Sequence, residues 1–143
     1  MKRAILSLLF FWLFVACSVA RAQDLVIVAN KSVKTAEVNA EDLKDVFSGE
    51  KTSLKDGSHA VPTTLKSGPV HEAFLKKYVG KGDPAFRAAW RSLVFTGQGS
   101  MPKSFDTEAD LLEFVSATAG AIGYVSAGAN PAAHEGIKVL AVK

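Results

Sequence analysis

The sequence has 143 residues, 48% of them hydrophobic and 22% charged, which suits one folded domain with a proper core. It has 17 basic and 14 acidic residues, but three basic residues lie in the first 22 positions, so 14 of each sign remain in residues 23–143. This balance excludes a strongly basic surface, and we expect no nucleic-acid partner. The single cysteine, Cys17, lies in the same N-terminal segment, so residues 23–143 can form no disulfide.

Residues 1–22 have the pattern of a cleaved secretory signal peptide. A basic start at residues 2–3 precedes an apolar run at residues 4–16 and an A-x-A cleavage pattern at residues 20–22. A membrane anchor is the less favoured alternative, because the uncharged stretch is shorter than the roughly 20 residues that span a bilayer. A lipoprotein signal at Cys17 is another, but the phenylalanine three positions earlier fits it poorly. We expect cleavage after Ala22, a domain of residues 23–143, and no stable membrane span after cleavage.

The rest of the chain alternates predicted strands and helices. Residues 25–29 are apolar and rich in β-branched side chains, as in a buried strand. Asn39 can cap a helix that ends at Gly49, and residues 59–65 look extended. Helix starts follow at Pro69, Asp83 and Thr107, and residues 121–125 and 137–142 form two further strands. The order is strand, helix, strand, three helices and two strands, which predicts an α/β domain.

Common catalytic and metal-binding patterns are missing from the sequence. The three histidines, His59, His71 and His134, have no metal-ligand spacing, and neither a G-x-S-x-G nor a complete phosphate-loop pattern occurs. Ser67 and His71 are one helical turn apart, which leaves a hydrolytic pair as a minor alternative without an evident carboxylate partner. We therefore expect a protein that is not an enzyme and that has neither a cofactor nor a metal.

The segment before the helix that starts at Pro69 is the clearest candidate for a binding site. The first N–H groups of a helix lack internal partners and carry partial positive charge, so a helix start can hold an anion. Ser67 and Gly68 then either cap the helix and form a turn, or contact an anion as well. Lys66 is either a solvated charge or part of the site.

Other candidates are less specific. Thr63 and Thr64 are expected as strand residues whose hydroxyls can contribute, and His71 either lies on the surface or reaches the anion, where it would titrate near neutral pH. Asn30 and Ser32 follow the first strand, and ligands favour the carboxyl ends of strands in open α/β sheets, although a plain loop is the alternative. Three aromatic residues are expected in the core rather than against a ligand: Trp90, Phe95 and Tyr124.

Four stretches, in this order, resemble the periplasmic substrate-binding proteins of phosphate ABC uptake systems. They are NAEDLKDVFSG at 39–49, VPTTLKSGPVHEAF at 61–74, WRSLVFTG at 90–97 and AGAIGYV at 119–125, the last being the most specific. The resemblance covers nearly all of residues 25–126. It implies one lobe of the type II periplasmic-binding-protein fold, with a mixed sheet flanked by helices, in the periplasm of a Gram-negative bacterium. It also implies phosphate or another small oxyanion as ligand, and an ABC permease or another envelope protein as partner.

The family holds phosphate on a loop of the form R-S-D-x-S-G-T before a helix. Ser67 and Gly68 match its Ser-Gly and Lys66 can replace part of the missing charge, but the Arg and Asp are unmatched and Pro69 replaces the Thr. The chain is also about one lobe long, so we expect an exposed, weakened site. The alternative is an interaction or regulatory protein that kept the fold and lost the ligand. The resulting candidate ligand-binding residues are Asn30, Ser32, Thr64, Lys66, Ser67, Gly68 and His71.

Overall fold

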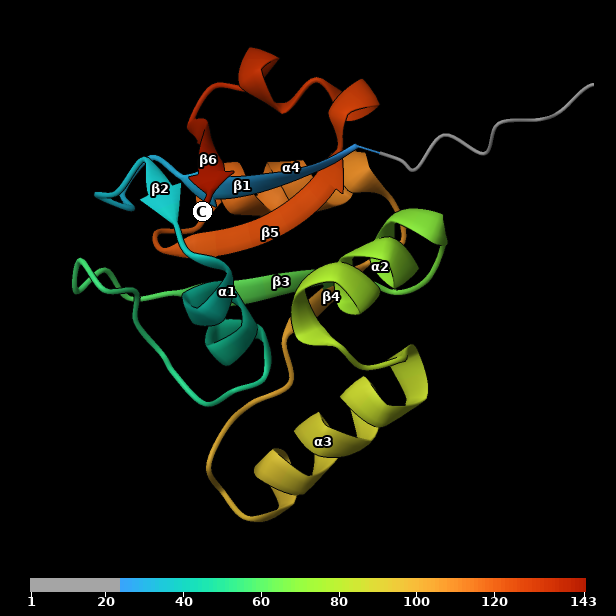
Figure 1. The fold of residues 1–143 in the computed structure, drawn as a ribbon. Coiled ribbons are helices and arrows are strands. Elements are labelled where there is room, and N and C mark those ends of the chain that lie inside the picture. Colours follow the sequence, from blue (N-terminus) through green and yellow to red (C-terminus); the bar gives the residue numbers. More distant parts are fainter. Residues whose placement is uncertain (1–23) are drawn as a thin grey trace, which may run out of the picture.

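A computed structural model describes residues 24–143, so the expected signal peptide lies outside the described residues. A six-stranded mixed sheet lies at the centre, in the order β2-β6-β1-β5-β3-β4 (Figure 1). Its strands are β1 (Leu25–Asn30), β2 (Glu37–Val38), β3 (Val61–Leu65), β4 (Lys103–Phe105), β5 (Ala121–Ser126) and β6 (Ile137–Val142). The helices are α1 (Ala40–Phe47), α2 (Pro69–Phe74), α3 (Asp83–Phe95) and α4 (Glu108–Ala117), with a π-helical turn η1 (Leu75–Val79) and 3₁₀ turns η2 (Ala127–Ala129) and η3 (Pro131–Ala133). The prediction of an α/β fold with a mixed, helix-flanked sheet is therefore confirmed.

Strand direction decides which loops meet at each end of the sheet. Strand β1 pairs antiparallel with both β5 and β6, whereas β3 pairs parallel with β5 and β4, and β2 pairs parallel with β6. Only β1 therefore runs against the others. Its first residue, Leu25, pairs with Ser126 at the end of β5, and its last residue, Asn30, pairs with Ile137 at the start of β6. The segment after β1 thus lies at the opposite end of the sheet from the segments after β3 and β5.

The two faces of the sheet are covered by different helices, as β5 makes clear. A side chain on Gly123 would collide with Leu111 of α4, so this face of the strand packs against α4. The next residue, Tyr124, points to the other face. Its ring stacks on Phe74 of α2, with centroids 3.9 Å apart, and Phe47 of α1 packs edge-on against Phe74 at 4.8 Å. Figure 1 accordingly shows α4 on one side of the sheet, with α1 and α2 on the other.

Helix starts agree well with the sequence prediction. The Asn39 side chain accepts a hydrogen bond from the Asp42 N–H at 2.7 Å, and the Thr107 hydroxyl accepts one from Asp110 N–H at 3.1 Å. Ser67 does not cap α2, because the N-cap residue is Gly68, whose φ of 104° favours glycine, and no side chain in the described part of the chain caps this helix. None of the helices in residues 24–143 is both long and apolar enough to cross a bilayer.

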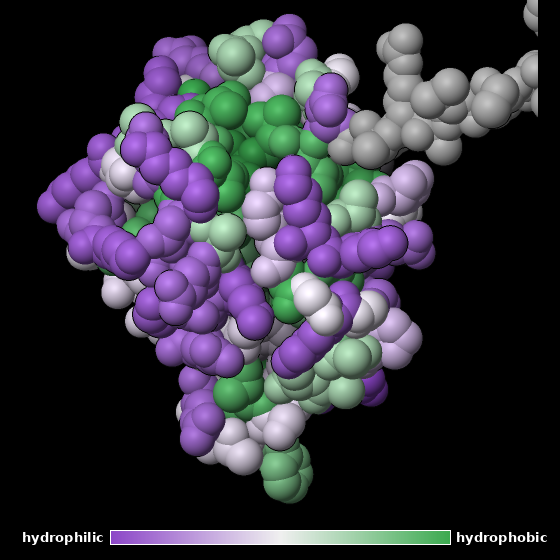
Figure 2. All heavy atoms as spheres, in the orientation of Figure 1, coloured by the Kyte–Doolittle hydropathy of each residue, from purple (hydrophilic) through white to green (hydrophobic). Residues whose placement is uncertain are grey.

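Two of the three aromatic predictions are confirmed. Trp90 and Tyr124 are buried, but Phe95 is 93% exposed, so its assignment to the core was wrong. Phe95 is the last residue of α3, which lies at the rim of the molecule away from the sheet, so its ring reaches no core surface (Figure 1). Polar residues cover much of the face drawn in Figure 2, and hydrophobic residues show mainly in its upper centre, over the sheet, with smaller groups near the lower tip, where Figure 1 places α3.

Candidate functional site

The candidate site is the loop of residues 66–68, which joins β3 to α2. The Lys66 N–H donates to the Phe105 carbonyl at 2.9 Å, which extends the pairing of β3 with β4 by one residue. Gly68 then turns the chain, and its carbonyl accepts the first helical bond, from Glu72 N–H at 3.0 Å. Ser67 is exposed at the tip of this turn. Because α2 continues directly into η1, the helical segment behind the loop extends from residue 69 to residue 79.

The start of α2 has backbone N–H groups without a protein acceptor. Among the hydrogen bonds between residues 24–143, none uses the N–H of Ser67, Gly68, Val70 or His71. Pro69 has no N–H to offer. This is the ordinary condition of a helix start, and these groups lie at the positive end of the helix dipole. The loop therefore presents donors that an anion can accept from.

Lys66 provides an exposed positive charge at the same loop. Its ammonium group lies 3.1 Å from Asp106, and the two side chains are 51% and 75% exposed. Exposed ion pairs of this kind contribute only about 0–1 kcal/mol, because water competes for both partners. The Lys66 side chain can thus leave Asp106 for a ligand at little cost.

A buried polar network lies beneath the loop and anchors it to the sheet. The Tyr124 hydroxyl accepts a hydrogen bond from the Leu65 N–H at 3.0 Å and is hydrogen-bonded to Nδ1 of His71. The other ring nitrogen of His71, Nε2, lies 2.7 Å from an Asp83 carboxylate oxygen. A neutral imidazole with its proton on Nε2 satisfies every member, because Tyr124 then donates to Nδ1 and Nε2 donates to Asp83. Burial raises the pKa of Tyr124, so its hydroxyl stays protonated.

His71 therefore occupies a different place from the one expected. Its side chain is buried, with only 1% of the residue exposed, so the expectation of a surface histidine was wrong. The reason is that the first turn of α2 lies over the sheet, where the imidazole meets Tyr124. Both ring nitrogens are occupied, so His71 has no nitrogen left to activate the Ser67 hydroxyl, and the hydrolytic pair has no geometric support.

Asp83 and Arg87, at the start of α3, complete this network. Arg87 Nε donates to Asp83 Oδ2 at 2.8 Å, and Arg87 Nη2 donates to the Lys66 carbonyl at 2.6 Å. Burial of the Asp83 carboxyl opposes its ionisation, but hydrogen bonds from Arg87 and His71 outweigh this effect and lower its pKa. The i, i+4 spacing of the pair was visible in the sequence. Its contact with a loop 21 residues earlier was not, because that contact depends on how α3 packs.

The threonine hydroxyls of β3 are occupied within the sheet. The Thr63 hydroxyl donates to the Ile122 carbonyl at 2.8 Å, and the Thr64 hydroxyl is hydrogen-bonded to that of Ser104 at 3.1 Å. Both threonines are buried. They therefore connect β3 to its two neighbouring strands, and Thr64 lies below the loop rather than at its surface.

Asn30 and Ser32 lie at the far end of the sheet from the loop. The Asn30 amide donates to the carbonyls of Val115 and Ser116 at 2.8 and 3.1 Å, and its oxygen accepts from the Ser32 N–H at 2.9 Å. The Ser32 hydroxyl accepts from the Gly120 N–H at 2.8 Å. The structure therefore does not bring these two residues together with the other candidates. The physical reason is the reversed direction of β1, which no single-strand pattern reveals.

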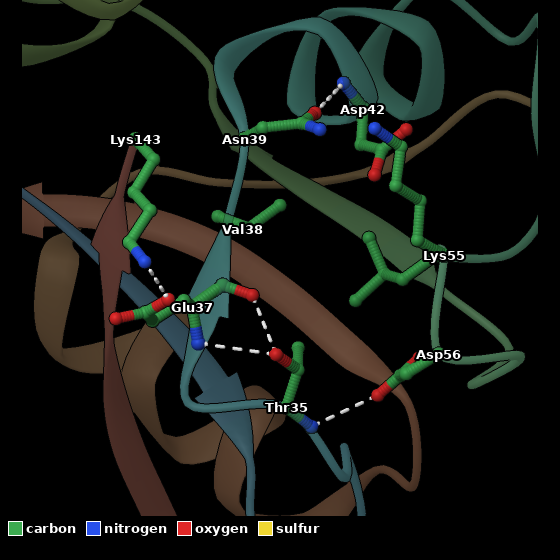
Figure 3. A pocket seen from close by; sticks show the side chains of 9 residues that line it. Thr35, Glu37, Val38, Asn39, Asp42, Lys55, Asp56 and Lys143 are labelled. Carbon is green, nitrogen blue, oxygen red and sulfur yellow. Dashed lines mark hydrogen bonds and ion pairs between the residues drawn. The ribbon is translucent and has the colours of Figure 1, made fainter.

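A separate pocket of about 220 Å³ lies between the start of α1 and the loop around Asp56 (Figure 3). Its polar groups pair mainly with one another: Thr35 N–H donates to Asp56 at 2.8 Å, and Lys143 lies 2.5 Å from Glu37. Burial of the Asp56 carboxyl opposes its ionisation, but hydrogen bonds from Ser58 and Thr35 prevail and lower its pKa. None of the predicted site residues lines this pocket, and residues 24–143 contain no cluster of His, Cys, Asp or Glu placed to hold a metal ion.

Neither a protein-family model nor a curated protein matches this chain, but solved structures do. PstS from Borrelia burgdorferi superposes with a TM-score of 0.64 at 16% identity, over 85% of this chain and 47% of its own. An ABC-type phosphate transport receptor from Vibrio cholerae has a TM-score of 0.60 at 18% identity, over 84% of this chain and 46% of its own. A phosphate ABC transporter substrate-binding protein from Clostridium perfringens, solved with bound phosphate, has a TM-score of 0.62 at 16% identity, over 84% of this chain and 45% of its own. The chain thus has the fold of phosphate ABC transporter substrate-binding proteins, over about half of their length.

Proposed function

We propose that this protein binds phosphate or a similar small oxyanion at the loop of residues 66–68, as a solute-binding protein. The observation that carries the proposal is the start of α2, where the N–H groups of Ser67 and Gly68 have no acceptor among residues 24–143. A fold shared with phosphate-binding proteins supports it, as does the exposed charge of Lys66. The solved neighbours are substrate-binding proteins rather than enzymes, and we propose no catalytic role.

The expected affinity is modest. Ser67 is exposed and Lys66 is about half exposed, so water competes for each hydrogen bond that the anion would accept. A hydrogen bond to a charged group contributes about 1.5–3 kcal/mol where it is protected from water, and less where it is not. Pro69 removes one further donor from the helix start. We therefore place the dissociation constant in the micromolar to millimolar range.

A periplasmic location and a permease partner belong to the same proposal. They rest on the predicted signal peptide of residues 1–22 and on the transport proteins that share the fold. The chain spans about half the length of those proteins, so delivery of the anion to an ABC permease is an inference from likeness.

Calorimetric titration of the protein, expressed from its full-length sequence, with phosphate at low salt tests the proposal. We expect saturable binding that arsenate competes for, and that Lys66→Ala and Ser67→Ala each weaken. Lys31→Ala is the matched control, because Lys31 is also exposed but follows β1 at the far end of the sheet. Absence of binding up to millimolar phosphate would contradict the proposal.

The second candidate function is interaction with another envelope protein. It is favoured by the exposed apolar end of α3, where Phe95 is 93% and Val94 is 42% exposed. If the protein has this function only, calorimetric titration with phosphate would give no heat of binding. Chemical cross-linking to an envelope partner would then be lost in the Phe95→Ser variant. Intact phosphate binding together with unchanged cross-linking would argue against it.

A further inference from the structure

A groove of about 330 Å³ lies between the end of α1, the start of β3, α3 and the segment of residues 98–103 that leads into β4. This volume is at the lower end of the roughly 300–1,000 Å³ that small-molecule pockets span. None of residues 66–68, the candidate oxyanion loop, lines the groove. Its wall is mainly apolar, and the larger apolar residues that form it are Val46, Val61, Pro62, Trp90, Met101 and Pro102.

Trp90 is a fixed part of this wall. Its indole Nε1 donates a hydrogen bond to the Phe47 carbonyl at 2.9 Å, and only 5% of the residue is exposed. The benzene edge of the indole lies against Gly49 and Gly99, where an added Cβ atom would come within 3.1 and 3.4 Å of ring carbons. Both glycines line the groove as well. A wall that is already held in place loses little conformational entropy when a ligand packs against it.

The groove runs beside the start of β3 but offers little to an added strand. Strand β4 pairs with β3 only from residue 63 onward, so the preceding residues have no strand on that side. Ala60 donates its N–H to the Thr52 carbonyl at 2.9 Å. Val61 donates its N–H to the Gly120 carbonyl at 2.8 Å, and Pro62 has no N–H. An extended peptide would find no backbone donor here, so the groove suits a small molecule better than a polypeptide strand.

The charges along the groove favour an acidic ligand. Its ionisable residues are Lys51, His59 and Lys103, and none of the described residues that line it is acidic. Lys51 is already paired with Asp42 and Asp45, at 3.2 and 2.7 Å. Lys103 is exposed and has no ion pair within residues 24–143. A carboxylate at the rim would therefore meet a complementary charge that no other side chain uses.

We propose that this groove binds a small organic acid, whose apolar body packs against Trp90 and whose carboxylate pairs with Lys103. Met101 lines the groove and is 43% exposed, so a ligand that covers it removes apolar surface from water. An aromatic monocarboxylate such as phenylacetate combines such a body with one negative charge. Phosphate has no apolar surface, so this site is separate from the oxyanion loop, and the inference does not rest on the proposed function.

Fluorescence titration of the protein, expressed from its full-length sequence, with phenylacetate tests the site. Trp90 is the only tryptophan in residues 23–143, so its emission reports on the groove. We expect a saturable change in emission. Phenethylamine has a similar shape but the opposite charge, and it should bind at least about 10-fold more weakly because it faces Lys103. Acetate, which lacks the apolar body, should give no change.

Variants at the two ends of the ligand locate it within the groove. Lys103→Gln should weaken phenylacetate binding roughly 5-fold, as for loss of an ion pair near the surface, and should leave binding of the neutral phenylacetamide unchanged. Met101→Glu adds a negative charge to the wall and should abolish phenylacetate binding, whereas Met101→Leu should retain it. Lys138→Gln is the matched control, because Lys138 lies on β6, three strands away from β3, and it should leave the affinity unchanged.

The outcomes decide the inference independently of phosphate binding. Absence of saturable binding of phenylacetate, by fluorescence and by calorimetry, would overturn it. Equal affinities for phenylacetate and phenethylamine would overturn it too, because the charge of Lys103 would then have no part in recognition. An emission change that Lys103→Gln and Met101→Glu leave intact would place the ligand elsewhere. Thermal unfolding of each variant excludes loss of fold as the cause, and phosphate should not compete with phenylacetate.

Discussion

Replacing Tyr124 with phenylalanine tests whether its hydroxyl anchors the candidate loop of residues 66–68 to the sheet. The hydroxyl is fully buried and contacts both the Leu65 N–H and the His71 ring. The replacement keeps the ring that stacks on Phe74 but leaves those two groups without a partner. A buried polar group left unpaired costs about 1–3 kcal/mol, and some relaxation of the His71 ring reduces the sum. We expect a loss of about 2–4 kcal/mol in the free energy of unfolding.

Urea unfolding followed by circular dichroism measures this loss directly. For a domain of this size, the same loss corresponds to a fall in melting temperature of about 8–15 °C. Tyr78→Phe is the matched control, because the Tyr78 side chain is only partly buried and its hydroxyl has no hydrogen-bond partner among residues 24–143. We expect that variant to lie within about 0.5 kcal/mol of the unmodified protein.

A small effect of Tyr124→Phe would refute the proposed network. If the two tyrosine variants are equally stable, the Tyr124 hydroxyl does not hold Leu65 and His71 together, and the loop is positioned by its strand pairing alone. A large loss for both variants would instead mean that the effect is not specific to the Tyr124 hydroxyl, because the Tyr78 hydroxyl has no hydrogen-bond partner among residues 24–143.

Three further predictions concern stability. Hydrogen bonds hold the pKa of Asp83 in the folded state below its pKa in the unfolded state, so the carboxylate stabilises the fold above the unfolded-state pKa and loses this effect as the pH falls through the folded-state pKa. Asp83→Asn should therefore reduce the difference between the urea unfolding midpoints measured at about pH 6 and at about pH 3. An unchanged difference would contradict this prediction. Gly120→Ala would place a Cβ atom 2.5 Å from the His59 carbonyl oxygen and should lower the free energy of unfolding by more than about 3 kcal/mol. Gly57 has a similar positive φ but open space around it, so Gly57→Ala should lower the free energy of unfolding by only about 1–2 kcal/mol. Equal losses for the two variants in urea unfolding would disprove the clash. Phe95→Ser should leave the melting temperature unchanged within error, and a marked fall would show that the ring packs against the protein.

Locally encoded features were predictable from the sequence. Asn39 and Thr107 cap their helices through bonds to residues three positions later, so a short window contains both partners. The helical segment that starts at Pro69, as predicted, ends at Gly80, where φ is 75°. Strands β2 and β4 were missed because they have two and three residues, and only pairing with a longer strand defines them.

The sequence identifies the loop of residues 66–68 as a candidate binding site, and this stays a prediction, whereas the network beneath the loop was not predicted. Ser67 and Gly68 stand before a helix start, a pattern visible in six residues. The contacts of Tyr124, His71 and Arg87 connect β5, α2 and α3, and sequence separations of 53 and 21 residues link them to their partners. His71 illustrates the difficulty, since a polar residue in a first turn is usually solvated and only the position of α2 over the sheet buries it. Asn30 illustrates the reverse case, because strand direction rather than residue type removed it from the site.

The absence of a side-chain cap on α2 bears directly on the choice between an ordinary helix start and an anion site. A serine that merely caps a helix accepts a bond from an N–H two or three residues later, as Asn39 and Thr107 do in this protein. Ser67 makes no such bond, and Gly68 occupies the cap position with no side chain to offer. Among residues 24–143, side chains cap α1 and α4 but neither α2 nor α3, whose N-cap residues are both glycines. Side-chain capping therefore does not account for Ser67, but α3 shows that an uncapped start is not by itself the mark of an anion site, so phosphate titration decides between the two interpretations.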